Sequence, residues 1–96
     1  MTWWRRSPRR LVIWSRAGCH LCDDMERTVR GLMGTRGVPP LELEVRDLDE
    51  AGREDPELLA RWTTKVPVLT VDGVEAAHWA VDETDVRRLV RRRPPR

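Results

Sequence analysis

Long apolar stretches are missing from this 96-residue chain, and none approaches the roughly 20 residues that a membrane-spanning helix needs. The apolar patch near the N-terminus covers only residues 11–14, against about 7–15 residues for the core of a signal peptide. Arg16 interrupts the residues that follow this patch. We therefore expect a cytoplasmic chain with no export signal and no membrane partner.

Cysteine and histidine are scarce as well. The only thiols are Cys19 and Cys22, and the only imidazoles are His20 and His78. A structural zinc site needs four ligands, but His20 lies between the cysteines and His78 is expected on a distant strand, so we expect no metal site. In a cytoplasmic protein, a CxxC pair is more often catalytic or metal-binding than structural. The two cysteines are therefore the first candidates for chemistry.

Acidic residues are absent from both ends of the chain. Residues 1–10 carry four arginines and residues 87–96 carry six, whereas the whole chain has a net charge of only +2, so residues 11–86 hold eight net negative charges. Basic ends can bind nucleic acid or anionic lipid. No aromatic residue alternates with the C-terminal arginines, as single-stranded nucleic acid would favour, so we expect solvated ends and no nucleic-acid partner.

The first half of the chain contains two strand patterns and one helix pattern. RLVIWS at residues 10–15 is a short apolar run, which predicts a strand buried on both faces. After the cysteines, apolar residues recur at helical spacing as far as Met33, and Gly34 predicts the end of that helix. LELEVRD at residues 41–47 alternates apolar and polar side chains, which predicts a strand at a sheet edge.

The second half contains two helices and a hairpin. DPELLARW at residues 55–62 predicts a helix with Asp55 as N-cap and Pro56 at its first position. Asp72-Gly73 predicts a tight turn between strands at residues 66–71 and 74–80, and residues 82–93 predict a last helix. The order β-α-β-α-β-β-α predicts an α/β fold with one mixed four-stranded sheet and flanking helices. We expect a flexible arm at residues 1–9, one domain at 10–92 and a basic tail at 93–96.

A CxxC pair directly after the first strand of such a unit is the thioredoxin-like redox arrangement. Cys19 is placed at the N-terminus of a helix, where unpaired backbone N–H groups and the helix dipole lower the pKa of a thiol from about 8.5. Cys22 lies nearly one turn further along and can act as the resolving thiol. Arg16 and a protonated His20 favour the thiolate, but two aspartates directly after Cys22 oppose it. We therefore expect a moderately lowered pKa at Cys19.

The segment KVPVL at residues 65–69 completes a set of motifs. CHLC follows the first strand, DPELLARW precedes the third, VPVL opens that strand, and VDG forms the hairpin turn. In this order and spacing, over roughly residues 10–92, the chain resembles a glutaredoxin-like protein of the thioredoxin superfamily, and is similar to the short bacterial domains of that kind. The resemblance implies a thioredoxin-like fold of the glutaredoxin type, a cis Pro67 beside the cysteines, and a main chain at Val66 that pairs with the substrate's backbone.

Two stretches depart from the glutaredoxin pattern. The usual Pro and Tyr are missing between the cysteines, and HWAVDETD stands where a Gly-Gly turn normally helps to hold glutathione. The start of the last helix still offers backbone N–H groups to a carboxylate, and Lys65 and Arg16 offer positive charge. The expected substrate-binding residues are therefore Lys65, Val66, Pro67, Asp82, Glu83 and Thr84, with His20 and Arg16 modulating the thiols.

The function that we expect is thiol–disulfide exchange, in which Cys19 attacks a protein or small-thiol disulfide and Cys22 releases the reduced product. We expect no tightly bound cofactor, a monomer, and glutathione, another low-molecular-weight thiol or a reductase as electron donor. Two alternatives remain open. One is a non-enzymatic binding or redox-sensing module of the same fold, and the other is a carrier of an iron–sulfur cluster shared within a dimer.

Overall fold

The computed structural model describes residues 8–92. The predicted C-terminal tail and all but the last two residues of the predicted arm lie outside this part of the chain. The strands are β1 (Arg9–Ser15), β2 (Leu41–Asp47), β3 (Val68–Val71) and β4 (Val74–His78). The helices are α1 (His20–Leu32), α2 (Leu48–Ala51), α3 (Pro56–Trp62) and α4 (Glu83–Arg91). None of these helices has the length and hydrophobicity that crossing a bilayer requires.

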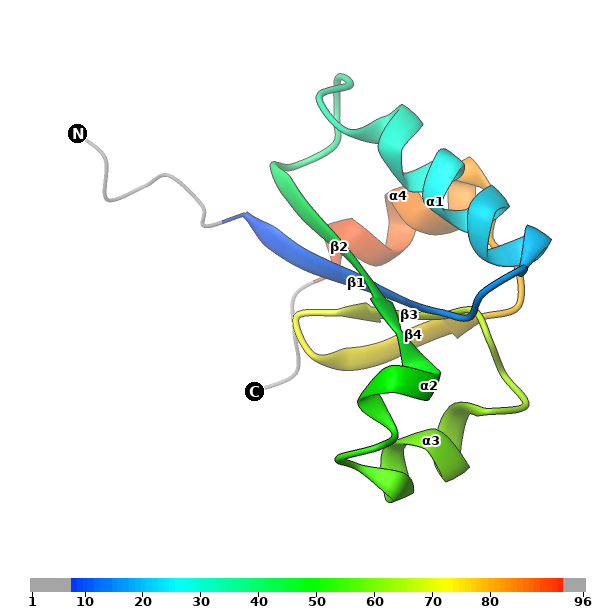
Figure 1. Ribbon diagram of the computed structural model, residues 1–96. Helices are drawn as coiled ribbons and strands as arrows, with labels where there is room; N and C mark the ends of the chain where they lie inside the picture. The colour runs from blue at the N-terminus through cyan, green and yellow to red at the C-terminus, as the bar shows by residue number, and fades with distance from the viewer. Residues whose placement is uncertain (1–7, 93–96) are drawn as a thin grey trace.

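The strands form one mixed sheet in the order β2-β1-β3-β4. β1 pairs with β2 in parallel and with β3 in antiparallel fashion, and β3 pairs with β4 in antiparallel fashion. The predicted fold, a mixed four-stranded sheet with flanking helices, is confirmed, as is the edge position of residues 41–47 (Figure 1). The hairpin turn also follows the prediction, because Asp72 and Gly73 both have positive φ, as a type I′ turn requires.

Helices cover both faces of the sheet because side chains alternate along β1. Leu11 and Ile13 enter a core cluster with residues of α1 and α4, such as Val29 and Val86. Val12 and Trp14 point to the opposite face. There Trp14 packs with buried residues of β3, α2 and α3, which are Val68, Leu48 and Trp62. In Figure 1, α1 and α4 accordingly lie on one side of the strands, and α2 and α3 on the other.

The structure adds one helix to the predicted order. α2 has only four residues, which is too short for a hydrophobic period to reveal. The Asp47 side chain caps it by accepting a hydrogen bond from the Glu50 N–H at 3.0 Å, and Leu48 anchors it in the core. Several boundaries also differ from the predicted ones, since β1 begins at Arg9, β3 begins only at Val68 and β4 already ends at His78. The last helix is shorter than predicted at both ends, at Glu83–Arg91.

The strand register brings four segments of the chain to one end of the sheet. Val68 at the start of β3 lies opposite Trp14 of β1 and His78 of β4, and Ser15 lies opposite Asp47 at the end of β2. The segments that leave the sheet at this end therefore include the loop to Cys19, helix α2, residues 63–67 and Trp79. This convergence positions the candidate site.

Candidate functional site

Cys19 is the N-cap residue of α1. Its Sγ accepts a hydrogen bond from the backbone N–H of Cys22 at 3.1 Å, so the sulfur takes the place that a capping oxygen usually holds. Gly18, with φ of +73°, lets the chain turn from β1 into the helix in a conformation that other residues rarely adopt. The sequence therefore places this sulfur where backbone N–H groups and the helix dipole favour negative charge.

Cys19 and Cys22 form a disulfide, with their Cα atoms 5.2 Å apart. The two sulfurs differ in environment. Cys22 is 3% exposed because it lies on the apolar face of α1 with Met25 and Val29, whereas Cys19 is only half-buried at the start of the helix. An attacking sulfur needs access and a resolving sulfur needs proximity, so the roles of Cys19 as attacking thiol and Cys22 as resolving thiol stay a prediction that this difference in exposure favours.

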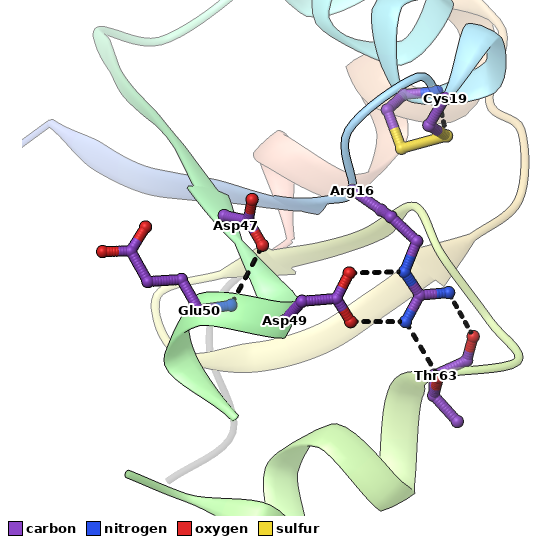
Figure 2. A network of polar contacts seen from close by, with 7 residues as sticks. Arg16, Cys19, Asp47, Asp49, Glu50 and Thr63 are labelled. Atoms are coloured by element: carbon purple, nitrogen blue, oxygen red, sulfur yellow. Dashed lines mark hydrogen bonds and ion pairs between the residues drawn. A yellow bond between two sulfur atoms is a disulfide. The ribbon is translucent and has the colours of Figure 1, made fainter. Parts of the chain in front are cut away.

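Arg16 extends from the loop between β1 and α1 and points to α2 and α3 (Figure 2). Its guanidinium donates to both carboxylate oxygens of Asp49, at 2.9 and 3.0 Å. It also donates to the carbonyl oxygen of Thr63 at 3.1 Å and to the Thr63 hydroxyl at 2.8 Å. Hydrogen bonding to Arg16 lowers the pKa of Asp49, and the same bond raises the pKa of Arg16. The positive charge predicted to modulate the thiols is therefore paired with a carboxylate. His20, the other predicted modulating residue, is exposed as the first residue of α1.

Lys65, Val66 and Pro67 lie in the connection from α3 to β3. The Val66–Pro67 peptide bond is cis, as the resemblance implies, and Pro67 is buried. The Lys65 ammonium lies 3.5 Å from Glu75, whose other carboxylate oxygen accepts a hydrogen bond from the indole N–H of Trp62 at 2.8 Å. The bond from Trp62, assisted by the charge of Lys65, lowers the pKa of Glu75. Lys65, like Arg16, thus faces an internal carboxylate.

Trp79 follows β4 and is 55% exposed. Three features fix it. Its backbone N–H donates to the Pro67 carbonyl at 2.8 Å, its indole N–H donates to the Thr64 carbonyl at 3.0 Å, and its φ of +68° turns it out of the strand. A large apolar surface is thereby held beside the cis-proline segment.

The start of α4 is capped by its own side chains. The Asp82 carboxylate accepts from the backbone N–H of Asp85 at 2.8 Å, and the Asp85 carboxylate accepts from the N–H of Asp82 at 3.1 Å. Of the three residues proposed here for substrate binding, Asp82 already uses its carboxylate in the cap, while Glu83 and Thr84 are exposed in the first turn. Within residues 8–92, no three His, Cys, Asp or Glu side chains lie together as a metal ion would need.

The model of one protein family, the glutaredoxin-like domain (DUF836), matches residues 10–91. The chain belongs to this family. The uncharacterized protein Rv0508 of Mycobacterium tuberculosis and the uncharacterized protein Mb0520 of Mycobacterium bovis are each 30% identical to it over 78 residues. Those residues cover 81% of this chain and 78% of each relative.

Two solved plant structures resemble the glutaredoxin-like chain in fold. The holo form of glutaredoxin C1 from Populus tremula x tremuloides matches with a TM-score of 0.50 and 22% identity, over 81% of this chain and 70% of its own. Wheat glutaredoxin matches with the same TM-score and identity, over 88% and 72%. Family membership, a glutaredoxin-type fold and a paired CxxC motif together support a thiol redox role.

Several residues of this glutaredoxin-like site were not predicted from the sequence. Asp49 of α2 and Thr63 at the C-cap of α3 hold Arg16 from 33 and 47 residues away along the chain, so no local pattern connects them. Trp79 falls within the strand predicted at residues 74–80, yet it lies beyond the end of β4 with its side chain exposed. An Asp two residues after a strand and a Trp directly after a strand were the available signals, and both are weak alone.

Proposed function

We propose that this chain is a thiol–disulfide oxidoreductase that reduces protein or small-thiol mixed disulfides through Cys19 and Cys22. One observation carries the proposal. The more accessible sulfur caps a 13-residue helix and accepts an N–H bond there, and it is bonded to a buried sulfur one turn away. This arrangement is that of the oxidised product of the reaction.

The proposed reaction has two exchange steps. The Cys19 thiolate attacks one sulfur of a substrate disulfide, a mixed disulfide forms, and the first substrate thiolate leaves. Cys22 then loses its proton and attacks the Cys19 sulfur, which releases the second substrate thiolate and closes the Cys19–Cys22 disulfide. Two electrons pass from the dithiol to the substrate, and both substrate thiolates take up protons from water.

The surrounding residues have distinct parts in this proposal. The N–H of Cys22 and the dipole of α1 stabilise the Cys19 thiolate. The main chain at Val66 pairs with an extended substrate backbone. Trp79 adds an apolar surface beside it. Glutathione, another low-molecular-weight thiol or a reductase then returns two electrons to the Cys19–Cys22 disulfide.

The test is a disulfide-reduction assay with single serine variants. We expect Cys19→Ser to reduce the rate to that of a chain lacking both cysteines, because no nucleophile remains. We expect Cys22→Ser to accumulate a covalent adduct between Cys19 and the substrate, visible by mass spectrometry, because the resolving thiol is absent. If both variants matched the unaltered chain, the oxidoreductase proposal would be wrong.

A further inference from the structure

Asp49 occupies the side of Arg16 that a ligand carboxylate would use. Two parallel N–H bonds join the guanidinium to the two oxygens of Asp49, which is the fork geometry that carboxylates prefer. Thr63 takes two further bonds. A guanidinium has five N–H donors, so four of the five are already used within the chain.

The position of Arg16 makes this pairing relevant to substrate selection. Arg16 lies three residues before Cys19 on the same loop, and its guanidinium contacts Thr63, which leads into the segment of Val66 and Pro67. In Figure 2, the disulfide and the Arg16 side chain leave the same loop, with Asp49 and Thr63 around the guanidinium. A small thiol bound to Cys19 would therefore extend from the same loop that carries this cation.

The Arg16 guanidinium is accessible to solvent, but its charge is paired with that of Asp49. The Arg16 side chain is 34% exposed and that of Asp49 is 52% exposed, so solvent reaches the pair and burial does not hide the guanidinium. Asp49 is ionised at neutral pH, as an ordinary aspartate is, and the hydrogen bond from Arg16 lowers its pKa further. An approaching carboxylate therefore meets a neutralised pair, and it must displace a carboxylate that is held intramolecularly.

We infer that Asp49 is a specificity-determining residue that excludes carboxylate-bearing thiols from the site by pairing with Arg16. This inference rests on the proposed function and names its small-molecule class, which is mixed disulfides whose small thiol presents no carboxylate to Arg16. Asp49 acts through Arg16 and is a positioning residue, not a catalytic one.

The inference is tested by binding, without a redox step. The oxidised full-length chain is titrated with S-methylglutathione, which carries two carboxylates and no free thiol, and with its diamide, which carries none. Backbone amide shifts in NMR spectra report both affinities. For the unaltered chain, we expect the dicarboxylate to bind no more tightly than the diamide, because Asp49 already occupies the bidentate face of Arg16.

Removing the internal carboxylate should change the ratio of the two affinities. We expect Asp49→Ala to favour the dicarboxylate over the diamide by about fivefold or more, because Arg16 regains a free bidentate face. Asp49→Asn retains the shape without the charge and should give a smaller gain. The double variant Asp49→Ala, Arg16→Ala should lose the gain. Glu26→Ala, which breaks an exposed ion pair with Arg30 on α1, is the matched control and should leave the ratio unchanged.

Three outcomes would overturn the inference. They are an unchanged ratio in both Asp49 variants, a dicarboxylate preference already present in the unaltered chain, and a gain that persists without Arg16. Absence of binding by either ligand to Asp49→Ala counts as the first of these, because an unmasked Arg16 would then recruit no carboxylate. The titration measures binding and does not depend on whether Cys19 reduces disulfides. A negative titration would therefore contradict only the inference about Asp49, and a negative assay with the serine variants would contradict the proposed function.

Discussion

At the scale of single residues, the site differs from the prediction mainly in its charges. Arg16 and Lys65 were both expected to offer positive charge to a ligand. Each instead faces a carboxylate of the same chain, Asp49 for Arg16 and Glu75 for Lys65. The sequence identifies the cations because each stands near a recognisable motif. It does not identify their partners, since these come from other elements and no periodic pattern links them.

Glu75 provides a test of such an internal pairing. Trp62 is 7% exposed and its indole N–H donates to Glu75, so removing the acceptor leaves a buried donor without a partner. We expect Glu75→Ala to lower the free energy of unfolding by about 1–2 kcal/mol, and Glu75→Gln to lower it by less, because the amide oxygen still accepts. Urea unfolding followed by tryptophan fluorescence measures both variants. Equal losses in the two would contradict a role for this hydrogen bond.

At the scale of elements, strands and helices marked by an apolar pattern or by a turn motif were predictable, and the four-residue helix α2 was not. The start of α3 was predictable from Asp55 as N-cap and Pro56 at the first helical position, and the structure confirms both. α2 was not predicted because its four residues are too few to show a hydrophobic period. Its N-cap, Asp47, also falls at the end of the predicted strand at residues 41–47. The helix that carries the cysteines was predictable because its apolar residues recur over three turns before Gly34.

Two glycines of the α1 region should respond to alanine in opposite directions. Gly18 has φ of +73° and no neighbour within 4 Å of an added Cβ, so alanine there meets backbone strain alone. We expect Gly18→Ala to cost about 1–2 kcal/mol of folding stability. Gly31 lies inside α1, also with open space around it, and Gly31→Ala should stabilise the chain by about 0.5–1 kcal/mol.

Thermal unfolding of the two glycine variants gives the comparison directly. Neither added methyl group meets another atom within 4 Å. The change in stability of each variant therefore reports backbone conformation, at the turn before Cys19 for Gly18→Ala and inside α1 for Gly31→Ala. Gly18→Asn is the useful third variant, since Asn tolerates positive φ better and should recover part of the loss. A neutral effect of Gly18→Ala would show that the turn relaxes to another conformation.

At the scale of the whole molecule, the order and direction of the strands followed from local patterns together with the handedness of β-α-β units. Convergence of the site loops at one end of the sheet then follows from the register. Contacts that close the opposite end were not predictable. Arg9 was assigned to a flexible arm, yet it lies in β1 and donates to the carbonyl oxygen of Val90 at 2.8 Å. It also pairs with Asp72 in the hairpin turn.

Asp72 therefore joins the hairpin turn to β1 through the charge of Arg9, and its contribution to stability should depend on pH. Partial burial acts to raise its pKa, but hydrogen bonds from the Arg10 N–H and the Arg9 guanidinium outweigh burial and lower it. A carboxyl group whose pKa is lower in the folded state stabilises the fold above its unfolded pKa, about 3.9, and this contribution is lost as the pH falls through the folded value. Asn also tolerates the positive φ at this position, so Asp72→Asn removes the charge and keeps the turn.

We expect Asp72→Asn to lower the free energy of unfolding by about 1 kcal/mol at pH 7, as for a hydrogen-bonded ion pair near the surface. Below the folded pKa of Asp72, the unaltered chain loses the same charge, so the two stability curves should converge as the pH falls below about 3.9. Urea unfolding across that range measures the convergence. If the difference in stability between the two chains stayed constant at all pH values, the loss would come from turn geometry and not from the ion pair between Asp72 and Arg9.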